Sequence, residues 1–211
     1  MGIGRRLEDA AISARDVSVA IIKQEHRALD VVLRALQRLV ADIAEHHSGE
    51  DFTLLAAALY YIDDFPERFH HPKEDRYLFN ALRRRTTQFN ILLDELQAEH
   101  IRGAQMNSHL QRAFVHYQGG APDGIKPFRA AVDAYAGMLR DHMRTEEELL
   151  AQPLGCLIEQ DWQEIEAAFD ANDDPLFGEH QREEFRKLYF RIVKLLPEKI
   201  RTPIRHTPRG Q

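Results

Sequence analysis

The chain has 211 residues, a net charge of −6, and a single cysteine, Cys156, beside eleven histidines. The acidic balance argues against nucleic-acid binding, and no window holds the eighteen apolar residues that a membrane-spanning helix needs. One cysteine excludes an internal disulfide and a cysteine-based zinc or iron–sulfur site within one chain, and it fits a reducing compartment. We therefore expect a cytoplasmic protein that binds neither nucleic acid nor membrane.

Apolar residues recur at spacings of three and four along the chain, which is the period of an α-helix. The first helix is expected to begin after Asp16, a favourable N-cap residue, and to end near His46. Its inner stripe comprises Val19, Ile22, His26, Leu29, Leu33, Leu36 and Val40. Residues 46–51 then predict a turn.

Three further long helices are expected. The second covers residues 52–84 and contains Pro66 and Pro72, each of which removes a backbone donor and should kink or break it. The third covers about 87–118, before Gly119, and the fourth about 127–151. Four long helices joined by short loops predict an all-α fold, namely an up-down-up-down four-helix bundle.

Two shorter helices are expected after the bundle. Asp161 followed by Glu164 predicts a capping box for a fifth helix that ends at Phe169, and a sixth is expected over 179–195. The pair is interpreted as a cap that packs on the bundle through Trp162, Phe169, Phe185, Leu188 and Ile192. The predicted organisation is an N-terminal extension over 1–16, the bundle over 17–152, the helical cap over 153–197 and a flexible tail over 198–211.

The second and fourth helices share a motif. Residues 70–78 and 142–150 both fit His-x-x-x-Glu-[Asp/Glu]-x-x-Leu. Positions i and i+4 lie on one face of a helix, so each motif can direct one imidazole and one carboxylate into the same space. The residues concerned are His70 with Glu74, and His142 with Glu146.

The first and third helices share a second pattern. Glu25-His26 and Glu99-His100 each lie in mid-helix, and neither histidine is followed by a carboxylate at i+4. Metal sites in bundles are built from facing side chains on different helices, and four imidazoles with two carboxylates form a two-metal ligand set in which the carboxylates can bridge. The predicted metal ligands are His26, His70, Glu74, His100, His142 and Glu146.

Simpler explanations exist for each residue taken singly. A lone buried histidine is more often a hydrogen-bonded core residue, and a His/Glu pair at i,i+4 is often a surface pair that contributes about 0.3–0.5 kcal/mol. The joint pattern favours metal, because each of these histidines lies in or beside the apolar stripe of its helix. Several buried histidines and glutamates without a metal would be costly to desolvate.

With these motifs the sequence resembles the hemerythrin-like, or HHE cation-binding, domains over about residues 17–152. The resemblance implies a non-haem di-iron centre in which both carboxylates bridge, with the six residues named above as ligands. The choice of two iron ions comes from the resemblance alone. Zinc and manganese also suit imidazole and carboxylate ligands, and they stay open.

One position departs from the oxygen-carrying hemerythrins, which have a second histidine one turn after the first in the third helix. Here that position is Ala104. Four imidazoles in place of five put stable dioxygen carriage in doubt. They favour a protein that reacts with or senses dioxygen, peroxide or nitric oxide, with iron storage or donation, or a metal-binding module without turnover, as the alternative. Whether it is an enzyme and whether it forms a homodimer stay open, and a metal-free helical interaction protein with a pH-responsive core is a further interpretation.

The neighbouring residues leave alternatives. His71 could replace His70, but its i+4 partner is Asp75, so we prefer the pair of His70 with Glu74, which keeps the register of the fourth helix. Glu25 and Glu99 could orient imidazoles, but adjacent residues point about 100° apart on a helix, so we expect them in solvent. Tyr135 is expected as a core residue, with a redox-active phenol as the alternative. The other histidines are expected on the surface: His46, His47, His109, His116, His180 and His206.

Overall fold

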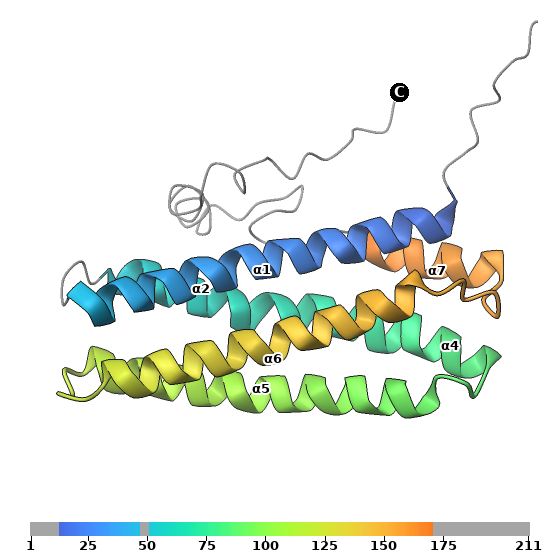
Figure 1. Ribbon diagram of the computed structural model, residues 1–211. Helices are drawn as coiled ribbons and strands as arrows, with labels where there is room; N and C mark the ends of the chain where they lie inside the picture. The colour runs from blue at the N-terminus through green and yellow to red at the C-terminus, as the bar shows by residue number, and fades with distance from the viewer. Residues whose placement is uncertain (1–12, 47–50, 171–211) are drawn as a thin grey trace, which may run out of the picture.

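The structure is a computed structural model, and it describes residues 13–46 and 51–170. Every regular element within these ranges is a helix, and no strand occurs among them. Figure 1 shows long helices that lie side by side, with a shorter one at one end. The all-α prediction is therefore confirmed.

The long helices have bounds close to those expected from the sequence. They are α1 (Ala14–His46), α5 (Asn90–Gln118) and α6 (Ile125–Ala151), together with a continuous helical run over residues 52–85. This run, here called the second long helix, comprises α2 (Phe52–Phe65), η1 (Pro66–His70), α3 (His71–Lys73), η2 (Glu74–Phe79) and α4 (Asn80–Arg85). The short helix is α7 (Glu159–Asp170).

The start of α1 differs from the prediction. The Ser13 hydroxyl accepts a hydrogen bond from the Asp16 backbone N–H at 3.2 Å and donates one to the Asp16 carboxylate at 2.8 Å. Ser13 therefore caps the helix, and Asp16 occupies its first turn. The expected inner stripe is buried except for Val19, which is half-buried. The predicted turn includes residues 47–50, which lie outside the described residues.

Pro66 and Pro72 neither break the second long helix nor stop its hydrogen bonding. The chain instead widens into two π-helical turns, η1 and η2, and in the first of them the His71 N–H donates to the Pro66 carbonyl five residues back. A wider turn absorbs the donor that proline lacks. It also reduces the angle between successive side chains, and both His70 and His71 point inward, with exposed fractions of 0% and 5%.

The helices enclose two apolar cores with a polar layer between them. Helix α1 packs against α2, α6 and α7, and α5 packs against α2 and α6. On each long helix, residues of one core lie on one side of the predicted site and residues of the other core lie on the opposite side. The flanking pairs are Ile22 and Leu29 on α1, Phe65 and Leu78 on the second long helix, Leu96 and Leu110 on α5, and Leu139 and Leu149 on α6. The predicted ligands therefore lie at one level of the structure.

Helix α7 confirms the expected fifth helix. Asp161 accepts a hydrogen bond from the Ile158 N–H at 3.0 Å, so it lies in the first turn and is not the N-cap that the sequence suggested. It also pairs with Arg85 at 2.8 Å, and Trp162 and Phe169 are buried as expected. The predicted sixth helix with its three apolar contacts and the predicted tail lie outside the described residues, as does most of the N-terminal extension. The domain boundaries stay predictions.

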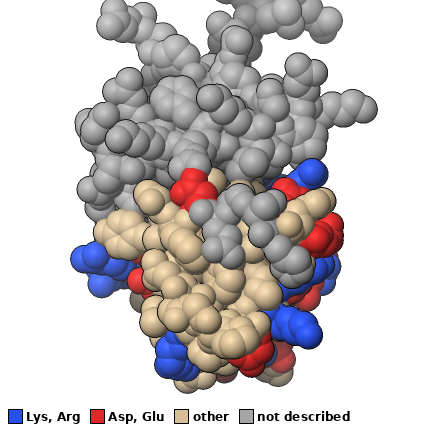
Figure 2. Space-filling view, turned by 90° about the vertical axis from the view of Figure 1, so that its left-hand side faces the viewer, with Lys and Arg blue, Asp and Glu red and all other residues tan. Residues whose placement is uncertain are grey.

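Within the described part, no helix combines the length and apolar character that crossing a membrane requires. Figure 2 shows the end of the molecule opposite α7, where uncharged residues occupy the middle and charged residues lie around them. A pocket of about 390 Å³ opens here, lined by Ile43, Phe52 and Tyr117 among others. None of the described residues that line it belongs to the predicted site.

Candidate metal centre

The six predicted ligands converge in the polar layer between the two cores. On one side, the His26 Nε2 atom lies 3.4 Å from Glu146 and 3.7 Å from Glu74. The His70 Nε2 atom lies 3.3 Å from the same Glu74 oxygen. All four side chains are at most 2% exposed, so two imidazoles face two carboxylates in a space closed to bulk water.

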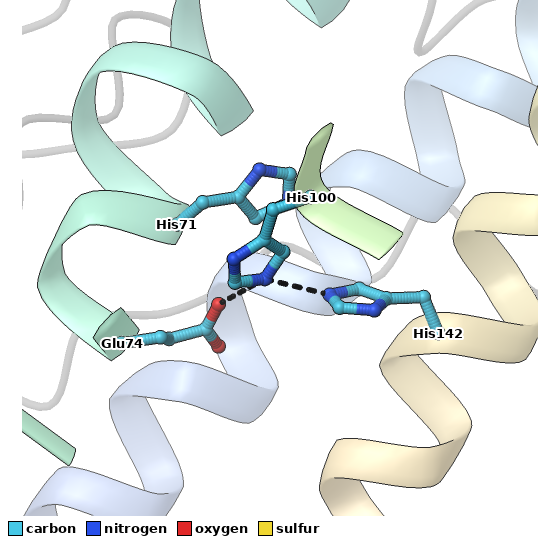
Figure 3. A group of neighbouring side chains, drawn as sticks. All are labelled: His71, Glu74, His100 and His142. Carbon is cyan, nitrogen blue, oxygen red and sulfur yellow. Dashed lines mark hydrogen bonds and ion pairs between the residues drawn. The ribbon is translucent and has the colours of Figure 1, made fainter. Parts of the chain in front are cut away.

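On the other side, the His142 Nε2 atom lies 3.3 Å from Glu146, and the His100 Nε2 atom lies 3.7 Å from Glu74. The two Nε2 atoms are 3.1 Å apart. Figure 3 shows the rings of His71, His100 and His142 gathered beside the Glu74 carboxylate. The two sides are therefore joined through Glu74 and Glu146.

These residues form two ligand groups. One contains His26, His70, Glu74 and Glu146, and the other contains His71, Glu74, His100 and His142, with the ligand atoms of each group within 4.8 Å of one another. Glu74 belongs to both groups, and Glu146 faces histidines of both. Two carboxylates between two sets of imidazoles match the predicted bridging arrangement. Their role as metal ligands stays a prediction.

His71 departs from the sequence interpretation. It was an alternative to His70, but the wide turns of the second long helix direct both rings inward. Both ring nitrogens of His71 are buried and lack a hydrogen-bond partner, and its ring stacks on that of His100 with centroids 4.1 Å apart. The candidate set therefore has five imidazoles, one more than the four predicted. The two prolines near the His-His pair were the sequence feature that could have indicated these wider turns.

A second layer of carboxylates surrounds the imidazoles. Each of the four histidines that were predicted as ligands has a carboxylate at its Nδ1 atom, on the side away from the centre. The pairs are His26 with Glu147 at 3.1 Å, His70 with Glu25 at 2.8 Å, His100 with Asp75 at 3.3 Å and His142 with Glu99 at 2.9 Å. An ionised carboxylate only accepts hydrogen bonds, so each Nδ1 carries a proton and each Nε2 faces the centre.

These pairs run in one direction around the structure. Each carboxylate is next in sequence to a predicted ligand of its own helix, and it supports the histidine of the next helix. A carboxylate of α1 accepts a hydrogen bond from the histidine of the second long helix, and a carboxylate of that helix accepts one from the histidine of α5. In the same way, α5 provides the acceptor for the histidine of α6, and α6 provides the acceptor for the histidine of α1. The four helices are thus linked at the level of the site.

Two of these carboxylates lie closer to the site than the sequence predicts. Glu25 was expected in solvent, but it is 1% exposed and also accepts a hydrogen bond from Lys73 at 2.8 Å. The Glu99 side chain is 29% exposed, so it is partly buried. Adjacent residues do point in different directions, but Glu25 and Glu99 point toward a neighbouring helix and not into solvent. The sequence alone gave no partner for either residue.

The charges of the site shift its protonation. Burial disfavours the cationic His26 ring, but the nearby carboxylates outweigh it and raise its pKa well above the usual value. The same balance raises the pKa of His142, and that of His100 to about 10. The pKa of Glu146 falls well below its usual range, because the surrounding histidines outweigh burial. Burial and the neighbouring imidazolium charges lower the pKa of His71, so that ring is neutral.

Buried atoms without hydrogen-bond partners show that the site fits a metal pair. They are Nε2 of His26 and His70, both nitrogens of His71, and both carboxylate oxygens of Glu74 and Glu146. Buried polar atoms are nearly always paired, so this concentration needs an explanation. Two cations, one in each group, would satisfy these oxygens and one nitrogen of each ring, and imidazole with carboxylate suits iron, zinc or manganese.

The remaining candidates lie where expected or outside the described residues. Tyr135 is 1% exposed, and its hydroxyl donates to the Ile62 carbonyl at 3.3 Å, as a core tyrosine does. His46, His109 and His116 are exposed. His47, His180 and His206 lie outside the described residues.

Two pockets reach the site. The first, of about 450 Å³, lies between the second long helix and α5; its lining includes Glu67, His71, Asp75, His100 and Ala104. The second, of about 280 Å³, lies between α1 and α6. Its lining includes His26, Asp30 and Glu147 together with Arg27, Arg34, Arg140 and Arg144. Carboxylates therefore flank the first pocket, whereas arginines predominate in the second.

A comparison with known protein families matches residues 17–154, more than half of the chain, to the family described as the hemerythrin HHE cation binding domain. The matched range contains all of the candidate ligands and carboxylates described above. No curated protein and no solved structure gives a match.

Proposed function

The chain belongs to the hemerythrin HHE cation-binding family, and we propose that it holds two iron ions and uses them to react with or sense dioxygen, peroxide or nitric oxide. The observation that carries this proposal is the pair of buried ligand groups that share Glu74. His26 and His70 would hold one ion, and His71, His100 and His142 the other. Glu74 and Glu146 would bridge them.

The proposal includes the topology of an up-down-up-down four-helix bundle. In Figure 1 each long helix begins at the end of the molecule where the preceding one stops. The contacts of α1 with α2 and α6, and of α5 with α2 and α6, support a closed arrangement of four. The four hydrogen bonds between Nδ1 atoms and carboxylates connect the same four helices in one closed circuit, which also supports the proposed bundle.

Bound iron would supply one-electron or two-electron redox chemistry. The chain's own part is to position the imidazoles through the four Nδ1 carboxylates, to neutralise the cations with Glu74 and Glu146, and to limit water by burial between two apolar cores. The group with His26 and His70 has one imidazole fewer than the other. A small ligand would therefore bind on that side.

The inward position of His71 bears on dioxygen carriage. Doubt about dioxygen carriage rested on a count of four imidazoles, and His71 offers a fifth from a different helix than the one that carries Ala104. The number of imidazoles therefore no longer distinguishes dioxygen carriage from reaction with, or sensing of, small oxidants. Dioxygen stays among the proposed ligands, and the spectra described next decide how it is handled.

The test is anaerobic reconstitution with Fe²⁺, followed by iron quantification and optical spectra on addition of dioxygen, peroxide and nitric oxide. We expect two ions per chain and a spectral change with at least one oxidant. Glu74→Ala and Glu146→Ala should abolish paired binding, because each removes a carboxylate shared by both groups. Glu95→Ala, on the exposed face of α5, is the matched control.

Three results would contradict the proposal at different points. Fewer than two ions per chain in the unaltered protein would refute the paired site. Two ions in both Ala variants would refute the ligand assignment. Two ions with spectra that no oxidant changes would instead favour iron storage or donation without turnover.

A further inference from the structure

We propose that divalent metal ions reach the site through the pocket between the second long helix and α5, and that Glu67 is the carboxylate that receives them there. This uptake route rests on the proposed two-metal site, but Glu67 itself is not among its ligands. The inference concerns how the buried site is loaded.

The pocket connects the surface with ligands of one group. Its lining includes His71 and His100 from the site, with Glu67 and Asp75 beside them, and no Lys or Arg is among the lining residues that the structure describes. Divalent cations such as Fe²⁺ bind carboxylates readily, and an excess of negative charge raises the local concentration of cations. The two carboxylates outnumber the one lining ring, His100, whose pKa of about 10 makes it cationic without metal. The pocket is therefore suited to draw cations toward His71.

Glu67 lies at the point where the pocket meets the site. Its Oε1 atom is buried and has no hydrogen-bond partner, although the side chain as a whole is 25% exposed. The same oxygen lies 3.7 Å from the His71 Nδ1 atom. One carboxylate oxygen is thus directed at a ligand while the side chain still reaches solvent. An unpaired buried oxygen needs a partner, and an incoming cation would be one.

His71 is the ring best placed to accept the ion from Glu67. The other four imidazoles each have a carboxylate hydrogen bond at Nδ1, whereas both nitrogens of His71 have no hydrogen-bond partner. No hydrogen bond must therefore break before His71 binds a metal. From there the ion would meet Glu74, His100 and His142, which complete the group.

The second pocket that reaches the site is less suited to cations. It touches His26, but four arginines line it against the carboxylates of Asp30 and Glu147. Arg34 and Arg140 share Asp30, each at 2.6 Å. The Arg140 Nη2 atom is buried there without a hydrogen-bond partner. The excess positive charge would repel a divalent cation, so the two pockets differ in the ions they admit.

Small residues of α5 keep the proposed route open. Gly103 is buried, and a Cβ atom there would lie 3.3 Å from Met138 Cε and 3.9 Å from Glu67 Oε1. Ala104 lines the pocket directly. A large side chain at position 104 would fill the pocket without replacing any of the proposed ligands.

The test measures the rate at which the metal-free protein takes up Co²⁺, whose absorption reports binding, in a stopped-flow instrument. We expect Glu67→Gln and Ala104→Phe each to slow uptake by about tenfold or more, the scale of electrostatic guidance, while the final stoichiometry stays at that of the unaltered protein. Added salt should slow the unaltered protein more than Glu67→Gln. The matched controls, Glu95→Gln and Ala98→Phe on the exposed face of α5, should keep the original rate.

Unaltered rates in Glu67→Gln and Ala104→Phe, with full final binding, would overturn the route. Equal slowing in the two controls would overturn it as well, because the effect would then not depend on the pocket. The proposed two-metal site is judged separately by the final stoichiometry. Uptake of fewer than two ions by the unaltered protein refutes that site, and the rates of whichever ion binds still test the route.

Discussion

Glu99 illustrates how one carboxylate can set the chemistry of a ring on another helix. It lies on α5 and accepts a hydrogen bond from Nδ1 of His142 on α6 at 2.9 Å. This bond fixes the orientation of the ring and makes its Nε2 atom the better ligand. Loss of such a partner typically lowers metal affinity by about 10–100-fold.

We therefore expect Glu99→Ala to weaken metal binding by about 10–100-fold while the final number of ions stays the same. Competition with a chelator of known affinity measures the change. Glu95→Ala, one turn earlier on α5 and exposed, should leave the affinity unaltered. Equal affinities in the two variants would show that the contact with His142 has no part in metal binding.

His71 provides a sharper test of the ligand set, because it belongs to only one of the two groups. We expect His71→Leu to weaken or remove one of the two ions and to leave the other, in a Co²⁺ titration that resolves both. The apolar side chain should also stabilise the metal-free protein in urea unfolding, because it removes buried nitrogens that have no hydrogen-bond partner.

The exposed His109→Leu variant, also a histidine on a long helix, is the control and should bind both ions normally. Two ions bound by His71→Leu with unaltered affinity would return the assignment to His70 alone. That result would also restore the original count of four imidazoles.

The sequence identified the six residues that converge but not the carboxylates behind them. Spacing within a helix shows which residues share a face, so His70 with Glu74 and His142 with Glu146 could be paired. The partner of Glu25 lies on another helix, and no spacing in one helix predicts it. Each supporting carboxylate is adjacent in sequence to a predicted ligand, but this pattern could be recognised only once the structure had shown the pairs.

At the scale of elements, helix bounds followed from caps, prolines and glycines to within a few residues. The second long helix has the expected bounds but a different conformation. Pro66 and Pro72 suggested a kink, whereas the chain forms π-helical turns there. Both responses accommodate a missing backbone donor, and local sequence does not choose between them. In the structure these turns accompany the burial of both His70 and His71.

The unexpected inward position of His71 has the same origin. A regular α-helix places only one of two adjacent histidines toward the centre, and the fourth helix offered a regular motif as precedent. The turns η1 and η2 lie on either side of His71 and change the angular step there. A prediction made with 3.6 residues per turn could not include this fifth imidazole.

At the scale of the whole molecule, a buried polar layer separates two apolar cores. Each core is stabilised by burial, but the layer between them contains carboxylate oxygens and ring nitrogens that lack hydrogen-bond partners. Such a layer costs free energy until it is paired. A metal that binds only the folded chain therefore adds stability to the entire molecule, since all four long helices contribute to the site.

This linkage predicts a pH-dependent thermal shift. Nearby carboxylates outweigh burial and raise the pKa values of His26 and His142, and that of His100 to about 10, so the metal-free fold keeps these protons to higher pH than the unfolded chain does. An unfolded histidine has a pKa of about 6.5, so the protons contribute stability to the metal-free fold below that pH, and the contribution is lost as the pH rises through 10. Metal must displace these protons, and acid therefore weakens its binding.

We expect the difference in Tm between metal-loaded and chelator-treated protein to be about 5–10 °C at pH 8 with metal at roughly 100 times its Kd, and to shrink as the pH falls toward 5.5. Differential scanning calorimetry at matched ionic strength measures it. Glu74→Ala should show little metal-dependent shift at either pH, because it lacks the carboxylate common to both groups. A shift that grows with acidification would mean that protons do not compete with the metal, and that these histidines are not its ligands.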